Sequence, residues 1–318
     1  MSKPVQYALT WLRANALEID GLCDIIKRYC MWFQGIQEKT FCTGIEGLIS
    51  LAALPNGKIA GGFWDPMVRV WDLDTGVCLL TLLRHTKAVF ALAVLSDGMF
   101  ASGSFDRTVC VWDSNTGACL QTLNGHISPV LSLAVLRNST LASGSGDKTV
   151  RVWDTDTGAC LRTLMGHTEP VYSLAVLSNG KLASGSYDKT VRVWDTDTGS
   201  CLLTLKGHIR GVDALAALCD GKLASGSWDH TVRVWDTTTG MCVLTLASHS
   251  KEVHDLAVLS DGTLASGSSD RTVRVWDTTT GACMLTLTGH SKGVHALTVL
   301  GDGKVASGYS DGTIIIWR

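Results

Sequence analysis

The chain has no apolar stretch of about 18 residues or more, so the sequence predicts no membrane-spanning helix. It has no run of basic residues, and its net charge of −2 argues against a dominant interaction with a nucleic-acid backbone. Its longest uncharged N-terminal stretch, residues 4–12, lacks a small-residue cleavage site and is not typical of a secretory signal. We therefore expect an intracellular protein, cytoplasmic or nuclear, that binds no nucleic acid.

Cysteine pairs at metal-binding or redox spacing are also missing. The 11 cysteines form no Cys-x-x-Cys pair, and their number is odd. One position, two residues after a Thr-Gly turn, accounts for Cys78, Cys119, Cys160, Cys201, Cys242 and Cys283. Residues at this regular spacing fall on different repeat units, so disulfide geometry between them is not expected. The sequence predicts reduced thiols at strand positions, with no metal ion or other cofactor.

Tryptophan, by contrast, recurs with a fixed period. Each step is 41 residues, and aspartate follows the tryptophan in every case but the last: Trp71, Trp112, Trp153, Trp194, Trp235, Trp276 and Trp317. A Trp-Asp dipeptide at a period of about 40–45 residues is typical of four-stranded propeller blades. The period therefore predicts seven blades that share one ring and form a single domain.

One repeat shows how a blade is built. In residues 167–207, short runs rich in Val, Leu, Ala and Thr (VYSLAVL, KLASGS, VRVWD and SCLLTLK) alternate with the turns SNG, YDKT and TDTG. Such runs predict strands, and the glycines supply the positive φ of tight turns. Each period thus holds four antiparallel strands, a to d.

These repeats identify the chain as a member of the WD-repeat β-propeller family, from about residue 36 to the end. The resemblance implies an all-β, seven-bladed ring that scaffolds protein complexes without catalysis. The chain stops just after strand c of blade 7, which would leave an unpaired edge. Because Gly35, Thr40 and Phe41 align with Gly158, Thr163 and Leu164, we expect residues 36–42 to supply the missing strand d.

Most repeats also contain a histidine, a serine and an aspartate, which could be mistaken for a hydrolase triad. The family resemblance implies instead that they join the strand-c tryptophan in a buried structural tetrad, and identical copies of one active site would be redundant. The tetrads that we assign are His126, Ser143, Asp147 and Trp153; His167, Ser184, Asp188 and Trp194; and His208, Ser225, Asp229 and Trp235. Blade 1 cannot build one, since Gly44 and Gly61 replace the histidine and the serine.

The blades are near-copies, so the positions that vary among them are informative. Variation concentrates just before the turn aspartate, and three and five residues after the histidine. The resemblance implies that these positions lie on the top face, around the central channel. The candidate partner-binding residues are Trp64, Phe90, Phe105, Leu131, Tyr172, Tyr187, Asp213, Trp228, Glu252, His254 and His295.

Clustered exposed aromatics are typical anchors of a protein-binding site, whereas the alternative is simple drift of loop residues. His254 and His295 could suggest a metal site, but no ligand motif supports one, and a polar half-face with some pH sensitivity is favoured. We therefore predict a non-enzymatic scaffold that binds a peptide or protein on its top face and acts as a monomeric propeller within a complex.

The first 34 residues differ in pattern from the 35–318 propeller. Their apolar spacing, with Pro4 at a helix start and Asp20 as an N-cap, predicts a short helical hairpin. The hairpin either packs on the propeller or recruits another protein. In the second case the protein could be the substrate-receptor subunit of a ubiquitin ligase, with the hairpin as adaptor contact, although the Trp-Asp-x-Arg signature of cullin-adaptor receptors is missing.

Overall fold

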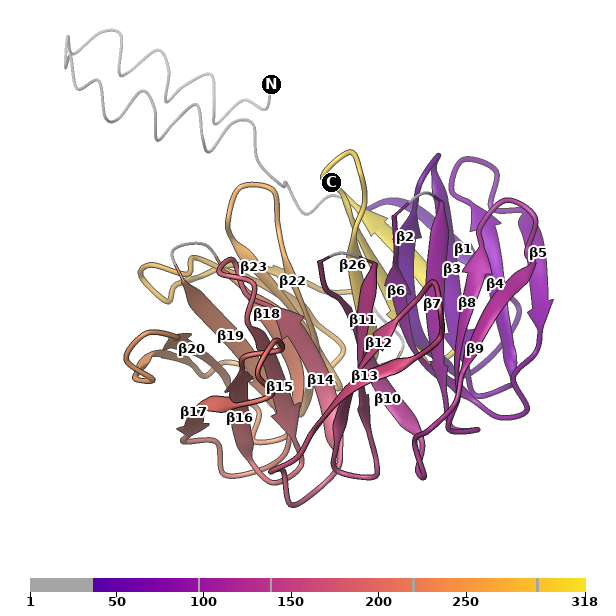
Figure 1. The fold of residues 1–318 in the computed structure, drawn as a ribbon. Coiled ribbons are helices and arrows are strands. Elements are labelled where there is room, and N and C mark those ends of the chain that lie inside the picture. Colours follow the sequence, from indigo (N-terminus) through magenta and orange to yellow (C-terminus); the bar gives the residue numbers. More distant parts are fainter. Residues whose placement is uncertain (1–36, 97, 138, 219–220, 290–291) are drawn as a thin grey trace, which may run out of the picture. The chain divides into compact units, whose positions relative to one another are not determined.

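The computed structural model describes residues 37–318, apart from residues 97, 138, 219–220 and 290–291. The helical hairpin expected in residues 1–34 lies outside the described residues. The described part is all-β and forms seven four-stranded antiparallel sheets, which are the blades of a propeller (Figure 1). The sequence-based prediction of the fold class is confirmed for this part of the chain.

The strands follow the repeat, four to a blade. Blade 1 contains β2 (Leu48–Leu54), β3 (Lys58–Phe63), β4 (Met67–Asp72) and β5 (Cys78–Leu83). Blade 2 contains β6 (Val89–Val94), β7 (Met99–Ser104), β8 (Val109–Asp113) and β9 (Cys119–Leu123). Blade 3 contains β10 (Val130–Val135), β11 (Thr140–Ser145), β12 (Val150–Asp154) and β13 (Cys160–Leu164). Blade 4 contains β14 (Val171–Val176), β15 (Leu182–Ser186), β16 (Thr190–Trp194) and β17 (Cys201–Lys206).

The remaining blades complete the ring. Blade 5 contains β18 (Val212–Ala217), β19 (Lys222–Ser227), β20 (Val232–Asp236) and β21 (Cys242–Leu246). Blade 6 contains β22 (Val253–Val258), β23 (Leu264–Ser268), β24 (Val273–Trp276) and β25 (Cys283–Leu287). Blade 7 contains β26 (Val294–Val299), β27 (Val305–Tyr309), β28 (Thr313–Trp317) and β1 (Gln37–Cys42).

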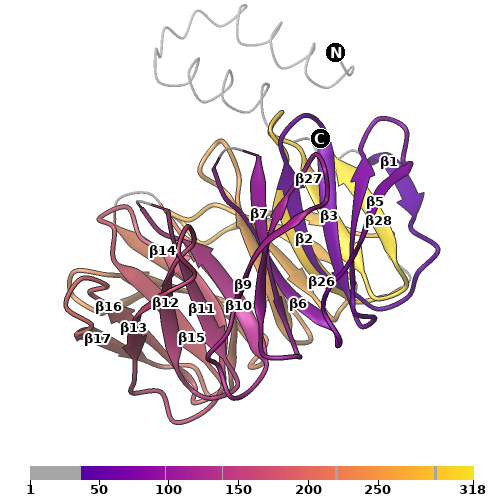
Figure 2. The ribbon, with the colours of Figure 1, turned by 45° about the vertical axis from the view of Figure 1, so that its right-hand side comes forward.

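Ring closure uses the two ends of the described chain. β1 pairs antiparallel with β28, with Thr40 opposite Ile315, and it supplies the fourth strand of blade 7 (Figure 2). Lys304 of blade 7 bridges Glu38 on β1 at 3.0 Å. The first strand of each blade contacts the first strand of the next, and β26 contacts β2. The pairing of β1 with β28 removes the open edge that the last blade would otherwise present.

The core lies between the blades. One apolar cluster joins Leu246 of blade 5 to Leu264 and Trp276 of blade 6, and another joins Trp71 of blade 1 to Ile314 of blade 7. A buried tryptophan removes about 150–250 Å² from water. At about 25 cal/mol per Å², this amounts to roughly 4–6 kcal/mol as an upper estimate. The 41-residue tryptophan period is therefore the period of the packing between blades.

Close packing explains the glycine of the repeated LASGS strand. A Cβ on Gly185 would lie 2.7 Å from Val212 Cγ1 of the next blade and 2.4 Å from Ser173 Oγ. A Cβ on the equivalent glycine of blades 2, 3, 5 and 6 would also lie 2.7 Å from Cγ1 of the equivalent valine in the next blade. Strand b is buried on both faces, whereas strand d at the rim is largely exposed. The described strand-d cysteines are free thiols.

Candidate top-face site

The top face is formed by the loops that enter the first strands and by the turns between the second and third strands. The first strands converge on a central cavity of about 270 Å³. Phe90, Leu131, Tyr172, Asp213, His254 and His295 line it together. Trp64, Phe105, Tyr187 and Trp228 lie in the turns outside this ring, and Glu252 lies in the loop before β22. The structure therefore places these candidate residues around one channel mouth.

The first aromatic cluster consists of Trp64, Phe90 and Phe105, from blades 1 and 2. The Trp64 and Phe90 rings meet edge to face at 5.4 Å between centroids, and Phe90 lies 5.8 Å from Phe105. Trp64 is 66% exposed and Phe105 is 43% exposed. The rings contact one another yet keep much of their surface open to solvent, which is typical of a binding surface.

The second aromatic cluster consists of Tyr172, Tyr187 and Trp228, from blades 4 and 5. Tyr187 and Trp228 form a T-shaped pair at 5.3 Å, and Tyr172 lies 6.2 Å from Tyr187 and 6.4 Å from Trp228. The Tyr187 ring rests on Gly211, where a Cβ would approach it to 2.6 Å. Glycine at this variable position therefore makes room for the aromatic ring.

Between the two clusters, blade 3 carries smaller side chains at the top-face positions. Gly146 occupies the turn position that carries an aromatic residue in blades 1, 2, 4 and 5, and it contacts Pro129. Leu131 is partly exposed at the channel. The two aromatic clusters are therefore separate surfaces, and blade 3, which has no aromatic side chain at this turn position, lies between them.

Blades 5 to 7 supply a polar sector. His254 Nδ1 lies 2.8 Å from Asp213 Oδ2, and His254 Nε2 lies 2.7 Å from Ser269 Oγ. The His295 ring stacks on His254 at 4.9 Å. Burial by itself would lower the pKa of His254, but the hydrogen bond and charge of Asp213 raise it above its usual value. Burial, together with the charge of His254, lowers the pKa of His295 to about 4.

The Asp213–His254–Ser269 arrangement has the atom order of a nucleophilic triad. The main-chain N–H of Ser269 donates to Glu252 O at 3.0 Å, which fixes the turn that carries the serine. The arrangement therefore holds the His254 ring in place between two partners. Among the described residues, no group of three or more His, Cys, Asp and Glu side chains lies close enough together to hold a metal ion.

Sequence reasoning missed Asp255 and the role of Ser269. Asp255 lines the channel, and its Oδ2 accepts the Leu297 N–H of the next blade at 2.7 Å. Burial raises the pKa of Asp255 to about 7 in spite of this bond. The signal was available in the repeat, because the same position holds only serine or alanine in the other blades: Ser50, Ala91, Ser132, Ser173, Ala214 and Ala296.

The assigned tetrad residues lie below this surface. In blade 5, His208 Nδ1 lies 2.7 Å from Asp229 Oδ2 and His208 Nε2 lies 2.7 Å from Ser225 Oγ, to which Trp235 Nε1 donates at 2.8 Å. The corresponding contacts of 2.7 Å recur in blade 3 among His126, Ser143, Asp147 and Trp153, and in blade 4 among His167, Ser184, Asp188 and Trp194.

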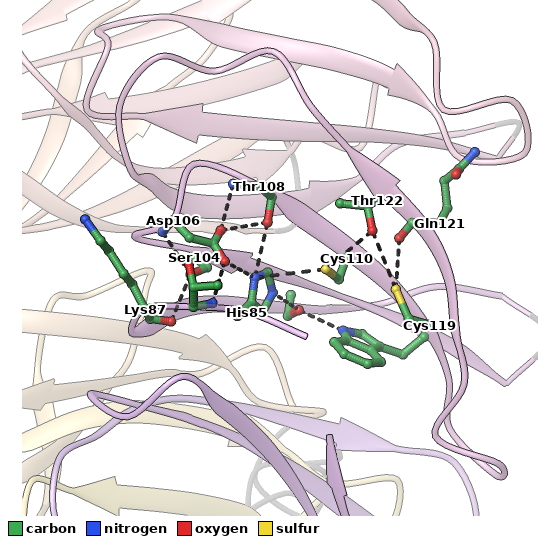
Figure 3. A network of polar contacts seen from close by, with 12 residues as sticks. His85, Lys87, Ser104, Asp106, Thr108, Cys110, Cys119, Gln121 and Thr122 are labelled. Carbon is green, nitrogen blue, oxygen red and sulfur yellow. Dashed lines mark hydrogen bonds and ion pairs between the residues drawn. The ribbon is translucent and has the colours of Figure 1, made fainter. Parts of the chain in front are cut away.

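Figure 3 shows the equivalent network of blade 2, in which His85 and Thr108 converge on Asp106. Ser143, Ser184 and Ser225 are all 0% exposed. Burial tends to raise the pKa of Asp229, but the hydrogen bonds from His208 and Thr231 hold it well below its usual range. The serine hydroxyls are enclosed between a histidine and a tryptophan, which is an arrangement suited to structure and closed to a substrate.

Blade 1 replaces the network by other means, and blade 7 keeps its serine–tryptophan bond. In blade 1, Asp65 forms a two-point ion pair with Arg69, at 3.0 and 2.7 Å, and Arg69 lies over the buried Phe63 ring at 5.3 Å. Gly44, which replaces the histidine, has a φ of +73°. In blade 7 the Tyr309 hydroxyl meets Ser307 Oγ at 2.5 Å, and Trp317 Nε1 donates to the same Oγ at 2.7 Å.

Comparison with known proteins agrees with this architecture. The WD domain, G-beta repeat model matches residues 76–113, 117–154, 158–195, 199–236, 240–277 and 281–318. Among solved structures, the WD40 beta propeller domain of Doa1 is similar, with 25% sequence identity and a TM-score of 0.82, over 90% of this chain and 97% of that chain. A comparison with curated proteins found no match.

The matched repeats cover most of the chain and leave out the first three strands of blade 1, the blade that lacks the tetrad histidine and serine. Propellers of this family typically serve as scaffolds that bind protein partners and are generally non-catalytic. No helix in the described part of the chain has the length and apolar character needed to cross a membrane. The predicted family is confirmed: the chain belongs to the WD-repeat β-propellers.

Proposed function

We propose that this protein is a non-catalytic scaffold that holds a peptide or a segment of a partner protein against the top face of its propeller. The observation that supports this most is the pair of aromatic clusters at one channel mouth. Protein-binding sites draw most of their affinity from a few aromatic anchors, and truncating such an anchor usually weakens binding by at least 1–2 kcal/mol. Rings held in contact by neighbouring rings lose little rotamer freedom when a partner arrives.

Affinity purification with mass spectrometry tests this proposal. The full-length protein and the variants Tyr187→Ala and Trp228→Ala are compared, with Thr204→Ala on the exposed β17 strand as the matched rim control. Partners retained by the wild type and by Thr204→Ala, but lost from the two top-face variants, support the top-face site. Retention by all four proteins would contradict it. The scaffold is proposed to act inside the cell, as one propeller within a larger complex.

A second assignment, the substrate-receptor subunit of a ubiquitin ligase, depends on residues 1–34, which lie outside the described residues. Co-purification of a cullin adaptor with the full-length protein, but not with a variant lacking residues 1–30, would support it. Without such co-purification, the simpler scaffold assignment is preferred.

A further inference from the structure

Two positions of the repeat place exposed cations around the top face. The residue after the turn aspartate is cationic in four blades, as Arg107, Lys148, Lys189 and Arg271. The second residue after the tetrad histidine position is cationic in four blades, as Lys87, Arg210, Lys251 and Lys292. All of these side chains are exposed. We call these two sets together the basic rim.

Few of the rim cations form ion pairs. Lys148 forms an ion pair with Glu169 at 3.6 Å, and Lys87 lies over the Phe105 ring at 5.6 Å. Across residues 37–318 as the structure describes them, the other rim cations take part in no ion pair. The turn aspartates beside them are bonded instead to the tetrad histidines, as Asp188 is to His167 at 2.7 Å.

The opposite face carries a repeated set of aspartates. The turns between the third and fourth strands hold Asp72, Asp113, Asp154, Asp195, Asp236 and Asp277. Each accepts main-chain N–H groups of its own turn, as Asp236 does from Thr239 at 3.0 Å. The net charge of −2 therefore does not reveal the rim, in which eight exposed cations stand among the carboxylates of the top face.

The second aromatic cluster and two rim cations adjoin one another. Lys189 follows Tyr187 by two residues in the same turn, and Arg210 precedes Gly211, on which the Tyr187 ring rests. A ligand that places an apolar side chain on Tyr187 and Trp228 thus brings its neighbouring residues within reach of both cations. Opposite charges at such a rim favour encounter and orientation of the correct partner.

We propose, building on the function proposed above, that the top-face partner is an acidic segment: an aromatic or aliphatic anchor seated on Tyr187 and Trp228, flanked by aspartate or glutamate residues that pair with Lys189 and Arg210. A carboxylate beside a guanidinium or ammonium group forms a charge-assisted hydrogen bond, which is stronger than a neutral one. The anchor supplies apolar burial, and the flanking charges supply selectivity.

Nucleic acid is the other polyanion that a basic rim could attract, and the geometry favours the peptide. Single strands bind by stacking bases on the open faces of aromatic rings. Here Tyr187 and Trp228 stand at 80° to each other, so the edge of one ring covers part of the face of the other.

Selection of random peptides on the immobilised full-length protein tests the proposal. The expected result is enrichment of acidic residues next to an aromatic or aliphatic one. A selected peptide should bind Lys189→Glu/Arg210→Glu about tenfold more weakly and weaken as salt is raised, because exposed charges are screened within about 8–10 Å. Lys222→Glu, on the opposite face, is the matched charge-reversal control and should bind as the wild type does.

The outcomes separate this inference from the function on which it rests. Selected peptides that lose binding in Trp228→Ala, but show no acidic enrichment and no response to Lys189→Glu/Arg210→Glu, would overturn the acidic-segment proposal and leave the scaffold function standing. Failure of the folded protein to select any peptide would overturn both. Displacement of a selected acidic peptide by single-stranded RNA, with RNA binding lost in Lys189→Glu/Arg210→Glu, would assign the rim to nucleic acid instead.

Discussion

His208→Ala removes an imidazole that joins the loop before β18 to Ser225 on β19 and to Asp229 in the turn after β19. His208 is 6% exposed and lies 2.7 Å from both Asp229 Oδ2 and Ser225 Oγ. After the change, the Ser225 hydroxyl still accepts from Trp235, but its proton loses its acceptor. Asp229 keeps the main-chain N–H groups of Ile209 at 3.1 Å and Thr231 at 3.0 Å.

The cost can be worked out from these contacts. Leaving a buried hydrogen-bonding group without its partner costs about 1–3 kcal/mol, and the empty imidazole site adds a cavity penalty. We expect a total of about 2–4 kcal/mol. A loss of 1 kcal/mol lowers the Tm of a domain of 150–250 residues by about 2–4 °C, and by somewhat less for a larger one. The variant should therefore melt roughly 5 °C below the wild type.

Differential scanning calorimetry of both proteins measures this shift. Thr204→Ala, an exposed substitution on β17 of the neighbouring blade 4, is the control and should change stability by less than about 0.5 kcal/mol. If His208→Ala and Thr204→Ala melt together, the buried network does not stabilise the blade, and the structural reading of these residues is wrong.

Two further predictions concern closure and the channel. Deleting residues 1–42 removes β1 and exposes the β28 edge, so the protein should aggregate or lose cooperative melting in circular dichroism. Deleting residues 1–30 keeps β1 and should have a milder effect on melting. If both truncated proteins melt as the full chain does, closure by β1 is refuted. Because the folded pKa of Asp255, about 7, lies above its unfolded value of about 3.9, this carboxyl stabilises the fold below about pH 4 and loses that contribution as pH rises through 7. Denaturant unfolding from pH 5 to pH 8 should therefore show a loss of stability, by about 1–3 kcal/mol, that is absent from Asp255→Asn, and identical pH profiles would refute the assignment.

The fold could be predicted because the same residues recur at the same positions in successive repeats. Trp153, Trp194 and Trp235 mark one strand of successive blades, and the packing between blades requires them at one depth. The strand expected from residues 36–42 is present as β1, which pairs with β28. An internal period reveals architecture because each blade must fit the next.

The polar contacts of the site could be predicted only in part. Asp213 and His254 were both named as candidates, but their bond joins residues 41 positions apart on neighbouring blades. A contact between side chains of neighbouring blades depends on how one blade is rotated relative to the next. The residue pattern along one strand does not show that rotation. Blade 1 makes the same point, since the Asp65 and Arg69 ion pair replaces the missing histidine by a contact that the repeat does not contain.

The basic rim could not be predicted from runs of like charge or from the net charge, for a related reason. Lys148 and Lys189 are separated by a full repeat, so they never form a run of like charge along the chain. The fold gathers them on one face, whereas a scan for basic segments and a net charge near zero both pass over them. A search for charge at equivalent repeat positions would have found them.

The central claim is that the top face binds a partner through its aromatic clusters. Isothermal titration of a purified partner into the wild type and into a variant with Trp64, Phe90, Tyr187 and Trp228 all changed to alanine tests it most directly, with melting of the variant as the check on folding. We predict that a variant that still melts cooperatively binds at least about a hundredfold more weakly, since several anchors at about 1–2 kcal/mol each are removed. Unchanged affinity in that folded variant would contradict the account.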